Sequence, residues 1–123
     1  MLAEETGDRR ALAQAHNILG MLATAAERHD EAVAQVEQSL VLAREAGDRE
    51  AEAAALNNLA LAVARLGRSD EAIVLTTAAL RLCVSLGDRH REAALRNNLA
   101  DLLHTTGRED EAIPCYTEAL ELG

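Results

Sequence analysis

Histidine, cysteine and asparagine are residue types whose spacing can indicate a metal site, a nucleophile or a set of ligand-binding amides, and the chain has four, two and five of them. His90 and His104 are fourteen residues apart. That spacing is about 21 Å along one helix, so the two side chains cannot share a metal ion. His16 and His29 have no partner at a spacing typical of metal ligands. The histidines therefore predict no metal site.

The two cysteines, Cys83 and Cys115, are too few for a disulfide framework and are not at a metal-ligand spacing. Neither has a nearby base and orienting group, which a thiol nucleophile needs. We expect reduced thiols on the helices of a cytoplasmic protein. There is no glycine-rich phosphate loop, because each Gly-Asp-Arg triplet marks a helix junction and occurs singly. The sequence thus predicts no enzyme and no cofactor.

The elements that carry these residues are predicted to be helices. The 123 residues include 26 alanines and 20 leucines, with one aromatic residue, Tyr116, and one proline, Pro114. Strands favour aromatic and β-branched residues, whereas Ala, Leu, Glu and Arg are strong helix formers. The composition therefore predicts an all-α fold.

The charge of the chain argues against nucleic acid as a direct partner. Twenty-one acidic and twelve basic residues give a net charge of -9, and all the basic residues are arginine. An acidic surface repels phosphates. Arginine and alanine have GC-rich codons, which favours a bacterial source. We see no signal peptide and no apolar run near the roughly 20 residues of a membrane span, so we expect a cytoplasmic protein.

The chain consists of three copies of one unit with a period of forty residues. Two triplets mark the period: Gly-Asp-Arg at residues 7–9, 47–49 and 87–89, and Asp-Glu-Ala at residues 30–32, 70–72 and 110–112. The asparagines recur with the same period. We predict one domain over residues 1–123, with repeats at approximately 7–46, 47–86 and 87–123.

Each unit is predicted to form two antiparallel helices. Gly47 and Gly87 suit the left-handed residue that follows a helix end. Asp48 and Asp88 suit the N-cap of the next helix, with Asp8 as the first example. The first helices are expected over roughly 9–26, 49–66 and 89–106, and the second helices over roughly 30–46, 70–86 and 110–122.

Small residues are expected where the two helices of a unit cross, and leucines on the flanks of that crossing. The small residues are Ala32, Ala72 and Ala112 on the second helices and Gly20, Ala60 and Ala100 on the first helices. Leu80 and Leu120 are expected to be buried. Helix pairs of this kind cannot bury their apolar faces alone, so we predict a right-handed superhelical α-solenoid of three antiparallel helix pairs.

The repeated motif resembles the tetratricopeptide repeat, in the longer class seen in kinesin light chains. The second unit has Asn-Asn-Leu-Ala at residues 57–60, then Gly67, Asp-Glu-Ala at residues 70–72, and Ala-Leu at residues 79–80. The third unit repeats this pattern. The first unit is looser, because Glu27 occupies the position of the loop glycine. The resemblance covers the whole chain.

The resemblance implies a concave surface, lined by the first helix of each unit, that binds a peptide or a partner protein. Carried onto this sequence, the implied binding residues are Asn17, Asn57, Asn58, Leu61, Arg65, Asn97, Asn98, Asp101 and His104. A ladder of amides could grip an extended peptide, since each amide both donates and accepts. Alternatively, one asparagine per repeat joins neighbouring helices and only stabilises the stack. The groove has no lysine for a carboxylate clamp, which argues against chaperone C-termini as ligands.

Both ends of the array are expected to be incomplete. Residues 1–6 align with residues 41–46 and are interpreted as the remnant of a preceding helix. The last helix has no successor, so part of its apolar side is expected to be uncovered, namely Ile113, Cys115, Ala119 and Leu122. We expect either a piece of a longer protein or a homodimer through the terminal helices.

Two functional hypotheses follow from these observations. The first is a protein-protein interaction module that binds a peptide or partner protein on its concave face. The alternative is a regulatory or sensory segment of a large bacterial transcriptional activator or signalling ATPase. The identity of the domains that flank the segment in its gene would distinguish the two.

Overall fold

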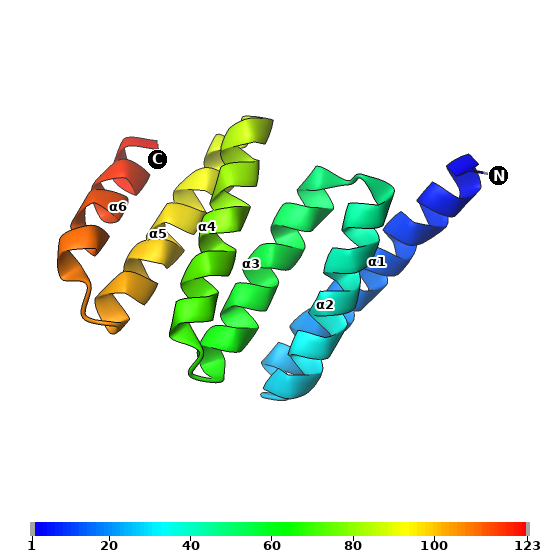
Figure 1. Ribbon diagram of the computed structural model, residues 1–123, viewed down its shortest axis with the longest axis horizontal. Helices are drawn as coiled ribbons and strands as arrows, with labels where there is room; N and C mark the ends of the chain where they lie inside the picture. Colours follow the sequence, from blue (N-terminus) through cyan, green and yellow to red (C-terminus); the bar gives the residue numbers. More distant parts are fainter. Residues whose placement is uncertain (1, 123) are drawn as a thin grey trace.

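A computed structural model describes the backbone of residues 2–122, and the side chains of residues 8–122 apart from 109, 119 and 122. The described residues form six helices and no strand: α1 (Leu2–Ala25), α2 (His29–Ala46), α3 (Arg49–Arg65), α4 (Ser69–Leu86), α5 (Arg89–Thr105) and α6 (Glu109–Leu122). The helices follow one another in a row with the termini at opposite ends (Figure 1). The prediction of an all-α solenoid of three antiparallel helix pairs is confirmed.

The junctions between repeats have the predicted caps. Gly47 and Gly87 follow α2 and α4 in the left-handed conformation, with φ of 67° and 72°. The Asp48 side chain accepts a hydrogen bond from the Ala51 amide at 3.1 Å. The Asp88 side chain accepts one from the amide three residues later at 3.0 Å. Each satisfies an amide that the first turn of the helix leaves without a partner.

The first helix begins earlier than predicted. α1 runs without a break from Leu2 to Ala25, through Gly7 and Asp8. Residues 2–6 are therefore joined to α1 and do not form the tail of a separate helix, and Asp8 is not an N-cap. A glycine in a helix interior costs only about 0.5–1 kcal/mol. At the other two Gly-Asp junctions the helix ends, because the helices on either side of the junction pack against each other.

The small residues lie at the helix crossings, as predicted. Ala32 and Ala72 are fully buried. Gly20 faces α2 so closely that a Cβ atom there would lie 2.3 Å from Val36 Cγ2. The absence of a side chain on Gly20 lets α1 and α2 approach, and a Val side chain fills the space instead.

The core runs through the middle of the stack and is aliphatic. Leu56, Val63 and Leu95 are almost fully buried. Leu80 on α4 is 8% exposed, as expected, and belongs to the same buried cluster as Leu95 on α5. The prediction that Leu120 is buried is wrong, since its side chain is 81% exposed. No later helix in the described residues covers that side of α6.

The first helices of the three pairs form one layer. α1 contacts α3 directly as well as its own partner α2, and hydrogen-bonded side chains join α3 to α5. Close approach of alternate helices is typical of the inner side of a curved helical array. We call the surface of α1, α3 and α5 the inner face.

Candidate binding groove

A cavity of about 440 Å³ opens on the inner face between α1 and α3. It is lined by Met21, Thr24, Ala25, Glu27, Asn58, Leu61 and Arg65. The apolar side chains in this lining are largely solvent-accessible, with Met21 55% exposed and Leu61 43% exposed. We call this cavity the first pocket.

A second cavity of about 130 Å³ lies between α3 and α5. It is lined by Asn57, Ala60, Leu61, Ala64, Thr76, Asn98, Asp101 and Leu102. Leu61 lines both this second pocket and the first pocket. A third cavity, of about 260 Å³, includes Gln14, Asn17, Ala54 and Arg91. All three pockets are lined by residues of the inner face, and we refer to them collectively as the inner groove.

The asparagines join the helices of the inner face to each other. The Asn58 amide donates from Nδ2 to Asn17 Oδ1 at 2.7 Å, between α3 and α1. The Asn98 amide donates from Nδ2 to Asn57 Oδ1 at 3.4 Å, between α5 and α3. In the Asn-Asn dipeptides of α3 and α5, the second asparagine thus bonds to the first or only asparagine of the preceding repeat. This is the stabilising arrangement that the sequence left open as an alternative to ligand binding.

These hydrogen bonds use only part of each amide. A primary amide has two N–H donors and a carbonyl oxygen with two lone pairs. The four bonded asparagines are half-buried, and each lines one of the three pockets: Asn58 the first, Asn57 and Asn98 the second, and Asn17 the third. The remaining donors and acceptors therefore lie along the inner groove.

The structure brings most of the predicted site residues into the inner groove. Asn58, Leu61 and Arg65 line the first pocket, and Asp101 lines the second. Asp101 also accepts a hydrogen bond from the Tyr116 hydroxyl on α6. The predicted residues Asn97 and His104 are exposed on α5 and are not among the linings of these three pockets.

Glu27 is a pocket residue that the predicted site did not include. It follows α1 with φ of 62°, the left-handed conformation that Gly67 and Gly107 adopt at the same place in the other repeats. The sequence carried a signal for it, since a glutamate stands where the repeat has glycine. Repeat comparison marks the unusual residue, but its place in a cavity depends on α3, which is far away in the sequence.

The charged side chains of the first pocket differ from several others in the described residues in that they form no ion pair. Several arginines in the described residues pair with carboxylates, for example Arg44 with Glu52 at 3.2 Å. Glu27 and Arg65 take part in no hydrogen bond or ion pair with another described side chain. Both are exposed, so their charges are available to a ligand.

The thiols and the phenol carry no sign of activation. Burial raises the pKa of the Cys83 thiol and that of the Cys115 thiol. The hydrogen bond to the Asp101 carboxylate raises the pKa of Tyr116. A raised thiol pKa lowers the fraction of thiolate, which is the reactive form. These shifts are opposite in direction to those of a catalytic nucleophile.

Within the side chains that the structure describes, no three histidine, cysteine or carboxylate groups lie together in a way that could hold a metal ion. None of the helices over residues 2–122 combines the length and the apolar character needed to cross a membrane.

Solved structures with the same fold span most of the chain. The TPR domain of Arabidopsis FLU is 19% identical with a TM-score of 0.82, and the match covers 92% of this chain and 95% of that domain. The Rap protein complexed with Competence and Sporulation Factor is 20% identical with a TM-score of 0.84. That match covers 89% of this chain but 30% of the Rap chain. BtubC (BKLC) from P. vanneervenii is 23% identical with a TM-score of 0.77, over 98% of this chain and 53% of that one.

Comparison with curated proteins finds no significant match. The tetratricopeptide repeat family model, in contrast, matches two overlapping segments, residues 11–83 and 53–122. Together these segments cover nearly the whole chain, in agreement with the repeated motif and with the helix pairs. The chain therefore belongs to the tetratricopeptide repeat family.

Proposed function

We propose that this interaction module binds an extended segment of a partner protein in the inner groove. The carrying observation is the first pocket, where the apolar side chains of Met21 and Leu61 are exposed beside an amide that is already held in place. Apolar cavities with a few oriented polar groups are typical of ligand sites. Leu61 continues this surface into the second pocket.

The bonded asparagines suit such a ligand because their orientation is set before it binds. Asn58 is held by Asn17, and Asn98 by Asn57. Little side-chain entropy is then lost when the remaining donors and acceptors bind a peptide backbone. In this proposal, one set of amides both joins the helices and contacts the ligand.

The alternative function is a regulatory segment of a larger bacterial protein. The Rap protein, which has the same fold, was solved in complex with Competence and Sporulation Factor. The matched architecture makes up 30% of that chain, so a protein that contains it was solved with a bound factor. If the present chain belongs to such a protein, we propose that it binds its ligand in the cytoplasm and relays that binding to the neighbouring domains.

Affinity capture from the host lysate with three forms of the chain tests the binding surface. Leu61→Asp places a charge in the inner groove, whereas Val74→Asp places the same charge at a 68% exposed position on α4. A partner bound in the groove is captured by the wild type and by Val74→Asp, and is lost with Leu61→Asp. Equal capture by Leu61→Asp would contradict the proposal.

Two asparagine variants separate the ligand role from the structural role. Asn58→Ala and Asn98→Ala should each weaken the captured partner by about 1 kcal/mol or more, roughly fivefold, because the amides of the partner lose a hydrogen bond. Asn17→Ala removes the same interhelical bond as Asn58→Ala, so its effect on the melting temperature is the matched control. Unchanged affinity with a lower melting temperature would assign Asn58 to stability alone.

We also propose weak homodimerisation through the terminal helices. Ile113 is 64% exposed and Cys115 is half-buried on α6, and the side chains of Ala119 and Leu122 lie outside the described residues. A two-fold contact that joins like ends would cover this side. Light scattering over a concentration series should show the mass doubling, more readily in salt, which screens the net charge of -9. A constant monomer mass would contradict it.

A further inference from the structure

The first pocket carries opposite charges on its two walls. Its apolar lining comes from Met21 and Ala25 on α1 and from Leu61 on α3. Glu27 lies in the loop that follows α1, and Arg65 is the last residue of α3. One wall of the pocket is therefore anionic and the other is cationic.

This charge pair is confined to one pocket. The positions that correspond to Glu27 in the other repeats are Gly67 and Gly107. Residues 25 and 105, which correspond to Arg65, are alanine and threonine. The third pocket also has charges of both signs, but its Asp48 pairs with Arg10 and its Arg91 pairs with Asp88. Among the described side chains, the unpaired charges Glu27 and Arg65 are therefore particular to the first pocket, and they are not part of the repeat that builds the fold.

The backbone at Glu27 is unfavourable for a side chain. Its φ of 62° lies in the left-handed region, which glycine adopts freely and other residues adopt at a cost. A glycine would close the turn at lower cost, as at residues 67 and 107. Strained backbone of this kind is concentrated at ligand sites. At Glu27 it coincides with a carboxylate that lines a cavity.

We propose that the first pocket takes one apolar side chain of the bound segment and selects the order of the charges on either side of it. A cationic residue of the segment lies beside Glu27, and an anionic residue lies beside Arg65. The partner is thus a segment with an apolar residue, such as leucine or methionine, between a basic and an acidic residue. This inference deepens the proposed function and rests on it.

The chemistry of the pocket favours this ligand over a uniformly charged one. A basic segment would be repelled by Arg65 and an acidic segment by Glu27, so neither satisfies both walls. Exposed charges contribute more to specificity than to affinity. For a segment that binds in one chain direction, reversing the order of the two charges replaces two attractions by two repulsions, and we expect an affinity difference of about tenfold at low salt.

Two labelled peptides of identical composition test the order directly. One has Lys-Leu-Asp and the other Asp-Leu-Lys at the centre of a Gly/Ser background, with both ends blocked. They are titrated into the chain labelled with methyl-¹³C methionine, and Met21→Leu identifies the pocket signal. One order should shift the Met21 signal with about tenfold higher affinity. A third peptide with alanine in place of the central leucine should bind more weakly than either.

Charge variants assign the preference to the two residues. Glu27→Gln keeps a side chain at the strained position and removes its charge, and Arg65→Gln removes the opposite charge. Each should reduce the preference to about threefold, and the double exchange Glu27→Arg with Arg65→Glu should reverse it. Arg81→Glu, at an exposed position on α4, is the matched control and should leave the preference unchanged.

The outcomes separate this inference from the proposed function. If both charge orders bind equally, or if neither shifts the Met21 signal, the charge selection is wrong. If Leu61→Asp still abolishes partner capture in that case, the proposal of binding in the inner groove stands without the charge selection. If Leu61→Asp has no effect on capture, the proposed function itself fails. Should the double exchange fail to fold, the two single glutamine variants decide the question.

Discussion

The middle helix pair and the two terminal pairs have similar sequences but different surroundings. Leu59 on α3 is 7% exposed, whereas Leu19, at the same position of the first repeat, is 48% exposed. Leu80 on α4 is 8% exposed, and its counterpart Leu120 on α6 is 81% exposed. The residue type and the position within the repeat are the same in each comparison. Burial of a position in this array therefore depends on whether a neighbouring pair covers it.

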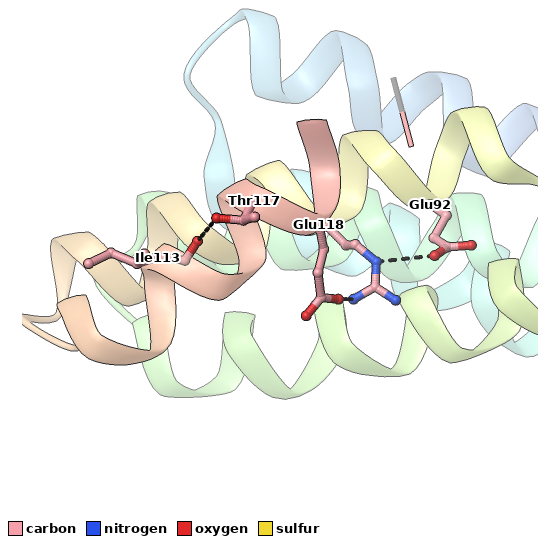
Figure 2. A network of polar contacts seen from close by, with 5 residues as sticks. Glu92, Ile113, Thr117 and Glu118 are labelled. Carbon is pink, nitrogen blue, oxygen red and sulfur yellow. Dashed lines mark hydrogen bonds and ion pairs between the residues drawn. The ribbon is translucent and has the colours of Figure 1, made fainter. Parts of the chain in front are cut away.

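Polar side-chain contacts join α6 to α5 in the last pair. The Arg96 guanidinium on α5 bonds Glu92 on its own helix at 3.1 Å and also bonds Glu118 on α6. Figure 2 shows Glu92 and Glu118 joined through this guanidinium. The Thr117 hydroxyl donates to the Ile113 carbonyl at 3.0 Å within α6, so it does not hold α6 to another helix (Figure 2).

The largest expected difference between the two regions concerns the leucines. Leu80→Ala should reduce the free energy of unfolding by about 2–5 kcal/mol, because it leaves a cavity between α4 and the next pair. Leu120→Ala should change it by less than about 0.5 kcal/mol, because the side chain is already in water. Urea denaturation of the two variants measures both. Equal losses would mean that Leu120 is covered in solution.

Overpacking at the helix crossing gives the next largest effect. Ala72 is completely buried between α3 and α4, so Ala72→Leu should cost about 1–3 kcal/mol by thermal or urea denaturation. Ala112→Leu, at the equivalent crossing of the last pair, should cost less because α6 can move outward. Ala34→Leu, at an exposed position on α2, is the control for the added side chain. A neutral Ala72→Leu would place the crossing elsewhere.

The two loops that follow α1 and α3 give a smaller effect. Glu27→Gly should raise the free energy of unfolding by about 1 kcal/mol, since glycine adopts the left-handed conformation without steric cost. Gly67→Glu should lower it by a similar amount, because nothing lies within 4 Å of the added Cβ and only the backbone strain remains. Thermal melting of both variants checks the pair. A destabilised Glu27→Gly would show that the Glu27 side chain makes stabilising contacts.

The smallest effect is expected at the polar tether of α6. Glu118→Gln should cost less than about 1 kcal/mol, because the Glu118 side chain is 49% exposed and its ion pair is screened by water. Hydrogen exchange of the α6 amides should nevertheless be faster in this variant, and the difference should shrink in high salt. Glu71→Gln, which removes an ion pair within one turn at the start of α4, should leave exchange in α6 unchanged.

Much of the inner groove could be predicted from the family pattern, and part could not. Four of the five asparagines, together with Leu61 and Arg65, follow from the repeat period and the resemblance and line the groove, whereas Asn97 does not. The pairing of Asn58 with Asn17 involves side chains forty-one residues apart in the sequence. The sequence left that pairing open because it depends on the distance between α1 and α3.

The sequence by itself determined the local features: the forty-residue period, the helix pairs, and the caps at Asp48 and Asp88. The caps and the helices depend on residues within one or two turns of each other, and the period is visible in the residue types alone, so composition and spacing are sufficient to predict them. The tertiary structure decided that α1 continues through Gly7, that Leu120 is exposed, and that Glu27 lines a pocket. The reason is that breaking a helix, burying a leucine and forming a cavity all depend on which other helices lie alongside.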